Sequence, residues 1–173
     1  SAAQMDDLIC DLLKYATIGR QDLERRPVSL DDALRAAQAM LESELRTTGA
    51  RLTVPETLPP VIADPTLLQV VFQNLISNAI KFVAPGVRPE VEIAARILPG
   101  FVQVTFTDNG LGIPAESRAQ LFRIFERLHP ELSCTGIGLA IVHRAIERLG
   151  GRIGVEAAPN GQGSRFWIDL PSA

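Results

Sequence analysis

Apolar residues recur with a helical period in four segments of the chain. In residues 4–18 they form a stripe of Met5, Leu8, Ile9, Leu12, Leu13 and Tyr15. Because no neighbouring segment offers this stripe a partner, we expect it to pack in a coiled-coil-like dimer or on sequence upstream of it. The second segment begins at Ser29, a suitable N-cap, and runs to about Thr48, where Gly49 is a suitable stop. Its expected buried face consists of Ala33, Leu34, Ala37, Met40, Leu41 and Leu45.

The other two helical segments are separated by predicted strands and loops. Asp64-Pro65 is an N-cap and N1 pair that opens a third helix, which continues through Phe82. A fourth helix is expected over residues 138–149. Strands are expected at residues 51–54, 91–97, 102–106, 152–156 and 165–170, and the second and third of these form an antiparallel hairpin around Pro99-Gly100. Residues 115–135 are expected to be irregular, with short helical turns.

Composition narrows the classes of protein that fit this pattern. The 173 residues are 46% hydrophobic and carry a net charge of −3, which suits one compact domain or one domain with a small appendage. The balance of 17 Lys and Arg against 20 Asp and Glu argues against disorder and against nucleic acid as a partner. The most apolar stretch, residues 61–83, is interrupted by charged and polar residues, so we expect no membrane span.

Two further features concern the setting of the chain. Cys10 and Cys134 lie far apart without metal-ligand spacing, and no secretory signal is present, so we expect a cytoplasmic setting. The first residue is Ser rather than Met and lies at the start of a helical pattern. We therefore expect the chain to be a fragment of a longer protein.

Polar residues form a stripe on the third predicted helix. Asn74, Asn78 and Lys81 lie at i, i+4 and i+7, and therefore on one face. An Asn carbonyl is a neutral oxygen ligand for Mg²⁺, which takes few protein ligands beside phosphate oxygens, and Lys81 would meet phosphate charge. On this motif alone, a solvated helix face is an equally good interpretation.

Glycine pairs occur in three places. Asp108-x-Gly110-x-Gly112 follows a predicted strand, where its carboxylate can accept a hydrogen bond from an amino group such as adenine N6, although this motif alone favours a tight turn. Gly136-x-Gly138 precedes the fourth helix, whose N-terminus presents backbone N–H groups and a positive dipole end to an anion such as phosphate. Taken by itself, Gly161-x-Gly163 indicates a hairpin loop.

Four motifs in this order resemble the N, G1, F and G2 boxes of histidine kinases: Asn74-x-x-x-Asn78, Asp108-x-Gly110-x-Gly112, Leu121-Phe122-x-x-Phe125 and Gly136-x-Gly138-Leu139. These boxes belong to the catalytic, ATP-binding (HATPase) module of the GHKL superfamily, and the resemblance runs from about Ser29 to Leu170. Gly161-x-Gly163 is similar to the last glycine box of the family. Residues 125–129 are similar to phytochrome-type sensor kinases. The resemblance implies an α/β (α+β) two-layer sandwich, in which a mixed sheet carries helices on one face.

The resemblance also implies roles at the nucleotide-binding positions. Asn78 would ligate Mg²⁺, Lys81 would contact phosphate, and Asp108 would bind adenine with help from Gly112. The ATP-binding positions carried over with them are Gly110, Ile113, Thr135, Gly136, Ile137, Gly138 and Leu139.

A mobile ATP lid is implied for residues 114–135. Phe122 and Phe125 would form its hydrophobic anchor, and Arg127 would be a lid cation able to contact the γ-phosphate. Cys134 stands where the family usually has a further glycine, so the lid is expected to differ in shape or to be less mobile. We expect Cys134 to be an ordinary loop cysteine rather than a redox group.

Asn74 bears on the reaction. ATP-hydrolysing relatives such as gyrase-type enzymes have a Glu at this position as the general base for water, and an amide cannot take a proton at neutral pH. Asn74, Lys81 and Arg127 are therefore expected to serve transfer of the γ-phosphoryl group to a histidine, from which it passes to an aspartate of a response regulator. Two alternatives remain: a non-catalytic ATP-binding regulatory module and a GHKL ATPase of another branch.

The domain organisation follows from the same resemblance. Neither His129 nor His143 lies where the family has its phosphoacceptor, so we expect the acceptor to be missing and the fragment to be inactive alone. Residues 1–20 are interpreted as the end of a dimerisation-domain helix, residues 21–28 as a linker and residues 29–173 as the catalytic domain. The implied partners are the dimerisation and phosphoacceptor domain of the same protein, in a full-length homodimer, and the receiver domain of a response regulator.

Overall fold

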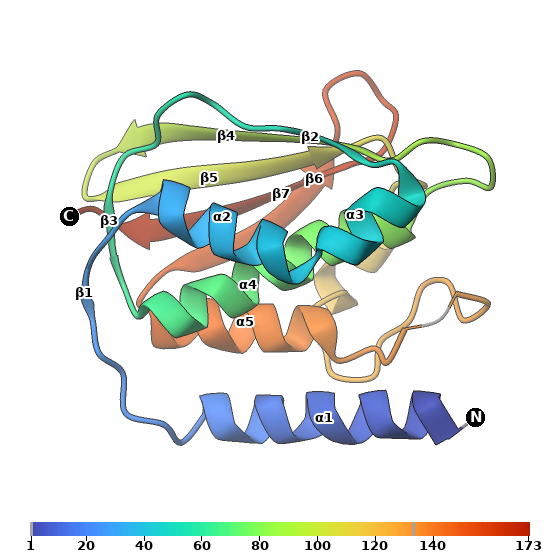
Figure 1. The fold of residues 1–173 in the computed structure, drawn as a ribbon, viewed down its shortest axis with the longest axis horizontal. Helices are drawn as coiled ribbons and strands as arrows, with labels where there is room; N and C mark the ends of the chain where they lie inside the picture. The colour runs from blue at the N-terminus through green and yellow to red at the C-terminus, as the bar shows by residue number, and fades with distance from the viewer. Residues whose placement is uncertain (1, 133) are drawn as a thin grey trace.

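The computed structural model describes residues 2–132 and 134–173 (Figure 1). Ser1 of the predicted N-terminal segment and Ser133 of the predicted lid lie outside the described residues. The elements in chain order are α1 (Ala2–Ile18), β1 (Arg26–Val28), α2 (Leu30–Met40), α3 (Glu42–Thr48), β2 (Arg51–Thr53), β3 (Val61–Ala63), α4 (Pro65–Lys81), β4 (Glu90–Leu98), β5 (Phe101–Asp108), the 3-10 helix η1 (Ala115–Gln120), α5 (Gly138–Arg148), β6 (Arg152–Ala157) and β7 (Ser164–Pro171).

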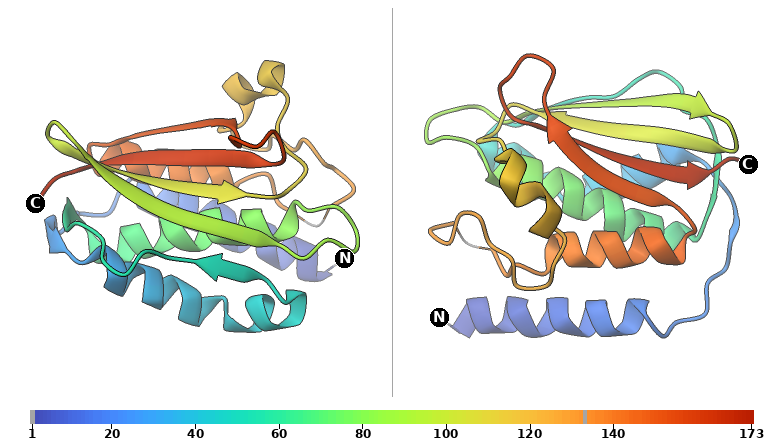
Figure 2. Two further views of the ribbon diagram at one scale, coloured as in Figure 1. Left: turned by 90° about the horizontal axis from the view of Figure 1, so that it is seen from above. Right: turned by 180° about the vertical axis from the view of Figure 1, so that it is seen from behind.

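The predicted sandwich with a mixed sheet is confirmed. Five strands form one sheet in the order β2-β4-β5-β7-β6, in which β2 and β4 are parallel and the other neighbours are antiparallel. Helices α2, α4 and α5 cover one face of this sheet, and α1 packs on α5 farther from the sheet (Figures 1 and 2). No helix among the described residues is long and apolar enough to cross a membrane.

Helix α4 forms in the place that its sequence predicts. The Asp64 carboxylate accepts hydrogen bonds from the backbone N–H groups of Thr66 (3.0 Å) and Leu67 (3.1 Å), and so caps the helix. The apolar side of α4 is buried against the sheet, where the rings of Phe72 and Phe106 lie 5.5 Å apart. With its apolar side held in this way, α4 turns its polar stripe toward the space beside the sheet.

The second predicted helix is in fact two helices. The chain leaves helical geometry at Leu41 (φ −104°, ψ 10°), which separates α2 from α3. This break places Leu41 in the core at 2% exposure and leaves Met40, which was expected to be buried, 61% exposed. The assignment of Met40 to the buried face was therefore wrong.

Two short strands were missed. Residues 26–28, within the segment interpreted as a linker, form β1 and pair antiparallel with β3, with Arg26 opposite Ala63. Neither segment shows an alternation of apolar and polar residues, so their pairing identifies them as strands. Beside this pair, the backbone N–H of Glu24 donates to the Asp64 carboxylate at 3.0 Å, which ties the segment after α1 to the start of α4.

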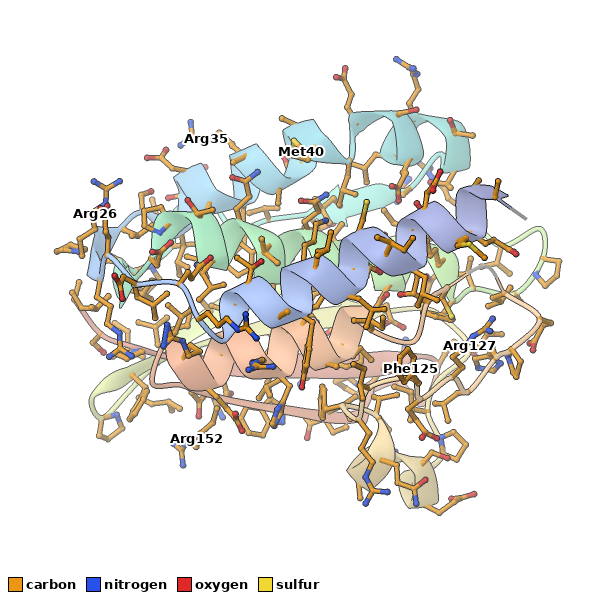
Figure 3. All side chains as sticks on the ribbon, turned by 90° about the horizontal axis from the view of Figure 1, so that it is seen from below. Arg26, Arg35, Met40, Phe125, Arg127 and Arg152 are labelled. Atoms are coloured by element: carbon orange, nitrogen blue, oxygen red, sulfur yellow. The ribbon has the colours of Figure 1, made fainter. Side chains whose placement is uncertain are left out.

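The apolar stripe of α1 is only partly covered. Ile18 is buried, and Leu8 and Tyr15 pack against the core. The exposed members of the stripe are Met5, Ile9, Leu12 and Leu13. Figure 3 shows this side of the molecule, with α1 lying across it.

Candidate functional site

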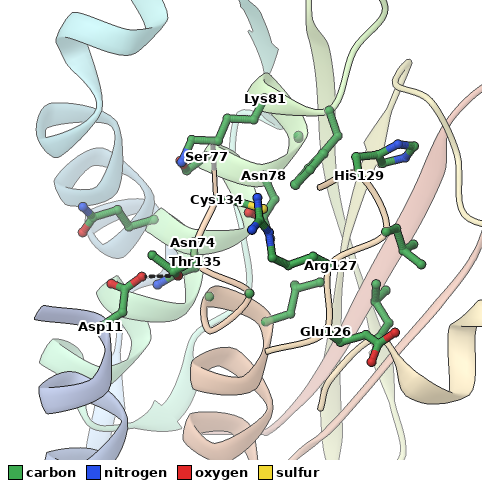
Figure 4. Close-up of a pocket in the computed structure, with 18 of the residues that line it drawn as sticks. Asp11, Asn74, Ser77, Asn78, Lys81, Glu126, Arg127, His129, Cys134 and Thr135 are labelled. Atoms are coloured by element: carbon green, nitrogen blue, oxygen red, sulfur yellow. Dashed lines mark hydrogen bonds between the residues drawn. The ribbon is translucent and has the colours of Figure 1, made fainter. Parts of the chain in front are cut away.

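A cavity of about 580 Å³ lies beside α4. Its walls come from α1, α4, the end of β5, the segment after η1, the N-terminus of α5 and the start of β7, and Figure 4 shows part of it. This volume falls in the range of small-molecule binding sites. Most of the residues that the four boxes single out line this one cavity.

The polar stripe of α4 faces the cavity. Asn74, Asn78 and Lys81 line it together, and Ser77, which the sequence did not single out, lies between them (Figure 4). The Asn74 Nδ2 donates to the carbonyl oxygen of Val70 at 2.8 Å. This bond leaves the Asn74 Oδ1 to face the start of α5.

Asp108 lies at the end of β5, on the cavity wall. Its Oδ1 accepts hydrogen bonds from the backbone N–H groups of Gly110 (2.9 Å) and Ser164 (3.0 Å). Burial raises the pKa of the Asp108 carboxyl above its ordinary value of 3.8, and these two hydrogen bonds act in the opposite direction. The two bonds use one carboxylate oxygen and so fix the orientation of the other.

Glycines allow the chain to close around Asp108. A Cβ on Gly163 would collide with the carbonyl oxygen of Asp108, and a Cβ on Gly110 would collide with that of Phe82. Gly112 (φ +78°) and Ile113 line the cavity, whereas Gly110 acts through its bond to Asp108 and is not part of the wall. Ser164 is a wall residue that the sequence analysis missed, although it directly follows the last glycine pair.

The two phenylalanines of the predicted lid anchor behave differently. Phe122 is not part of the cavity wall: it stacks on the ring of His143 at 5.6 Å and meets Phe166, which does line the cavity, edge-on at 6.4 Å. Phe125 is 56% exposed and has a left-handed backbone (φ 67°), because its N–H donates to the Gly136 carbonyl at 2.8 Å and the side chain turns outward. The expectation that Phe125 anchors the lid was therefore wrong.

Arg127 lines the cavity, but its guanidinium group is hydrogen-bonded within the lid. Its Nη2 donates to the carbonyl oxygens of Pro130 (2.8 Å) and Leu132 (3.0 Å). His129, which was expected to be an ordinary loop residue, also lines the cavity, where its ring lies 6.0 Å from that of Phe82 and its Nδ1 lies 3.3 Å from a Glu131 carboxylate oxygen. The signal in the sequence that could have placed His129 at the cavity was its closeness to Arg127.

The turn before α5 brings backbone donors to the cavity. Thr135, Gly136, Gly138 and Leu139 line it, whereas Ile137 is fully buried beneath the turn and is not part of the wall. Gly138 is the first residue of α5, so the positive end of that helix dipole points at the cavity. Such an end attracts anions.

Helix α1 completes the wall, which the sequence did not predict. The side chains of Asp11 and Thr135 are hydrogen-bonded, with 2.6 Å between Oδ2 and Oγ1 (Figure 4). Asp7 and Lys14 of the same helix also line the cavity. No sequence signal joins these residues to Thr135, because they lie more than a hundred positions away.

The donor set for a metal is sparse. In the part of the chain that the structure describes, no group of three or more His, Cys, Asp or Glu residues could hold a metal ion. Asn78 offers an amide oxygen on the cavity wall. A single neutral ligand fits Mg²⁺ that is held mainly by the phosphates of a bound nucleotide, and it does not fit a cation held by protein alone.

Comparison with known proteins identifies the family of this chain. Residues 63–173 match the family described as histidine kinase-, DNA gyrase B-, and HSP90-like ATPase. Cyanobacterial phytochrome A of Nostoc sp. (strain PCC 7120) is 38% identical over 169 residues, which cover 96% of this chain and 22% of the phytochrome. The chain thus spans about a fifth of the length of that curated relative.

Two solved structures are similar over almost the whole chain. Full-length ShkA in complex with AMPPNP has a TM-score of 0.79 at 30% identity, covering 96% of this chain and 35% of ShkA. Histidine kinase ThkA in complex with the response regulator protein TrrA has a TM-score of 0.77 at 25% identity, covering 99% of this chain and 48% of ThkA.

Proposed function

Since this chain belongs to the family of histidine kinase-, DNA gyrase B- and HSP90-like ATPases, we propose that ATP binds in the cavity beside α4, with adenine at Asp108 and the phosphates at the turn before α5. Within the family, the chain is the ATP-binding catalytic domain of a two-component sensor histidine kinase, as the four boxes predicted. One observation carries the proposed pose. The Asp108 carboxylate, the amide stripe of α4 and the N-terminus of α5 share a single cavity.

At the adenine end, the carboxylate of Asp108 accepts the hydrogen bond that the N6 amino group donates. The N–H groups of Gly110 and Ser164 hold its Oδ1, so that Oδ2 is turned to the nucleotide. An ionised carboxylate can only accept hydrogen bonds. The site therefore favours a purine with an amino group at that position, which donates, over one with a carbonyl oxygen, which also accepts.

At the phosphate end, the backbone N–H groups at the start of α5 and the side chain of Lys81 receive the negative charge. Asn78 would hold Mg²⁺ together with the phosphate oxygens, and bound Mg²⁺ would neutralise charge on the transferring group. Arg127 reaches the γ-phosphate after it releases the carbonyl groups of residues 130 and 132.

The reaction is transfer of the γ-phosphoryl group to a histidine, followed by transfer to an aspartate of a response regulator. Asn74 supports transfer over hydrolysis, because an amide does not act as a general base for water. We place the acceptor on a dimerisation domain of the parent protein. His129 pairs with Glu131, and His143 stacks on Phe122 and lies 3.5 Å from Glu147, which supports structural roles for both.

Labelled ATP tests this proposal. Incubated with ATP and Mg²⁺ alone, the chain is expected to remain unlabelled. When a dimerisation domain that carries an acceptor histidine is added, that domain should become labelled in an acid-labile, alkali-stable form. Nucleotide binding without any transfer favours the regulatory module, and stable label on this chain alone contradicts the placement of the acceptor.

A further inference from the structure

Helix α1 contacts the phosphate end of the cavity through one hydroxyl group. The Oδ2 of Asp11 lies 2.6 Å from the Oγ1 of Thr135, the residue that directly precedes the turn at Gly136 (Figure 4). The same Oγ1 accepts the backbone N–H of Ile137 at 3.3 Å. Thr135 therefore connects α1 to the turn whose N–H groups face the proposed phosphate site.

A threonine hydroxyl carries a single proton. The short distance to Asp11 is typical of an O–H group that donates to a carboxylate. A hydroxyl that donates to Asp11 cannot at the same time donate to a phosphate oxygen. The carboxylate of Asp11 thus holds the position on Thr135 that an oxygen of a bound phosphate would take.

Charge acts in the same direction as this geometry. Asp7 and Asp11, one helical turn apart, both line the cavity from α1, and Lys14 of the same helix offsets only one of their two charges. A polyphosphate at the start of α5 would face these carboxylates, and like charges repel across a partly desolvated space. Bound nucleotide therefore disfavours the docked position of this part of α1.

The two ends of α1 are held unequally. At the C-terminal end, Ile18 is buried and the Arg144 guanidinium lies 4.5 Å from the centre of the Tyr15 ring. Gly19 lets Arg144 approach, because a Cβ there would collide with the guanidinium. At the N-terminal end, Met5 and Ile9 are exposed and Leu8, which packs against the core, is only partly buried, so this half has the weaker anchor and is the half that would leave the cavity.

We infer that Asp11 is an intramolecular competitor for ATP: its carboxylate occupies Thr135 when α1 is docked, and nucleotide phosphate displaces it. This inference rests on the proposed nucleotide site and adds its regulation. Undocking of α1 frees the phosphate end, and any upstream movement that pulls α1 from the cavity raises the affinity for ATP. Through the contact between Asp11 and Thr135, the position of α1 sets the affinity of the cavity for nucleotide.

Titration of AMPPNP with Mg²⁺ into the full chain tests the competition. Asp11→Ala is expected to bind about five- to tenfold more tightly than the wild type, because a charge-assisted hydrogen bond no longer opposes binding. The matched control is Asp6→Ala, which removes the same charge from an exposed position of the same helix outside the cavity wall and should bind like the wild type. Circular dichroism of each variant checks that the fold is retained.

A double-mutant cycle identifies the hydroxyl. In a Thr135→Val background, Asp11→Ala should give a clearly smaller gain, because the hydrogen bond is already gone and only the charge repulsion is relieved. AMPPNP should also increase amide hydrogen exchange in residues 4–11 of the wild type more than in residues 15–18. Equal or weaker binding by Asp11→Ala, or a gain that is undiminished in Thr135→Val, overturns the competition and leaves the proposed function standing. Absence of AMPPNP binding by every variant and the wild type overturns the proposed function and this inference with it.

Discussion

The side-chain oxygen of Asn74 faces Gly138, the first residue of α5: a Cβ at that position would lie 3.1 Å from Oδ1. The bond from Asn74 Nδ2 to the Val70 carbonyl sets this orientation. An amide oxygen therefore lies where a helix N-terminus presents its N–H groups, at the phosphate end of the cavity. In the proposed pose, the pair places a group without basic character beside the phosphoryl group to be transferred.

A carboxylate at this position should alter the fate of ATP. We expect Asn74→Glu to raise steady-state ATP hydrolysis by about tenfold or more, because a general base becomes available to water. The matched control is Asn74→Gln, which has the same length without the charge. Equal hydrolysis by the two variants in a phosphate-release assay would contradict the role assigned to the amide.

Asp108 should decide affinity for the adenine base. In Asp108→Asn, the Oδ1 can keep the bonds from Gly110 and Ser164, so an NH₂ group takes the place of Oδ2 and meets the donating amino group of adenine. We expect AMPPNP to bind about 30-fold more weakly or worse, a loss of about 2 kcal/mol. Asp22→Asn, at an exposed position away from the cavity, is the control for calorimetric titration. Unchanged affinity of Asp108→Asn would remove the adenine assignment.

The same substitution should stabilise the protein in a pH-dependent way. Burial raises the pKa of Asp108 in the folded state, so its contribution to stability is present below 3.8 and is lost as the pH rises through the raised pKa. At pH 7 the folded protein therefore carries the cost of a buried charge. We expect Asp108→Asn to melt at a higher temperature than the wild type at pH 7, and the difference to shrink toward pH 3.8. A constant difference across this range in calorimetry would refute the explanation.

Two glycines of the last hairpin allow the cost of backbone strain to be measured separately from the cost of a steric clash. Gly161 (φ +82°) has open space around it, whereas a Cβ on Gly163 (φ +93°) would collide with the Asp108 carbonyl. We expect Gly161→Ala to cost about 1 kcal/mol of unfolding free energy, from backbone strain alone. Gly163→Ala should cost about 3 kcal/mol or more, because β7 must move away from β5. Urea unfolding measures both costs. Equal costs would show that the close approach of Gly163 to the Asp108 carbonyl does not contribute to stability.

The two phenylalanines of the lid offer a similar comparison. Phe122 packs on His143 and Phe166, whereas Phe125 is exposed. We expect Phe122→Ala to cost about 2 kcal/mol of unfolding free energy through lost packing, and Phe125→Ala to cost about 0.5 kcal/mol or less. A larger loss at Phe125 than at Phe122 in urea unfolding would restore Phe125 as the lid anchor.

Much of the fold could be predicted because its signals are local. The cap at Asp64 and the apolar period after it define α4, and the alternation around Pro99-Gly100 defines the hairpin of β4 and β5. The short strands β1 and β3 were not predicted, since each is identified by pairing with a segment far along the chain. The break at Leu41 was also missed, because no Pro or Gly marks it in the sequence.

The sequence by itself determined the chemistry of the site. Asn74, Asn78, Asp108 and the glycines before α5 are identified by short motifs whose order is characteristic of the family. Only the tertiary structure decided that the wall includes α1 and that the hydroxyl of Thr135 donates a hydrogen bond to Asp11. The reason is physical. A helix period or a glycine turn depends on residues that are neighbours in the sequence. A contact across 124 positions depends on how separately formed elements pack.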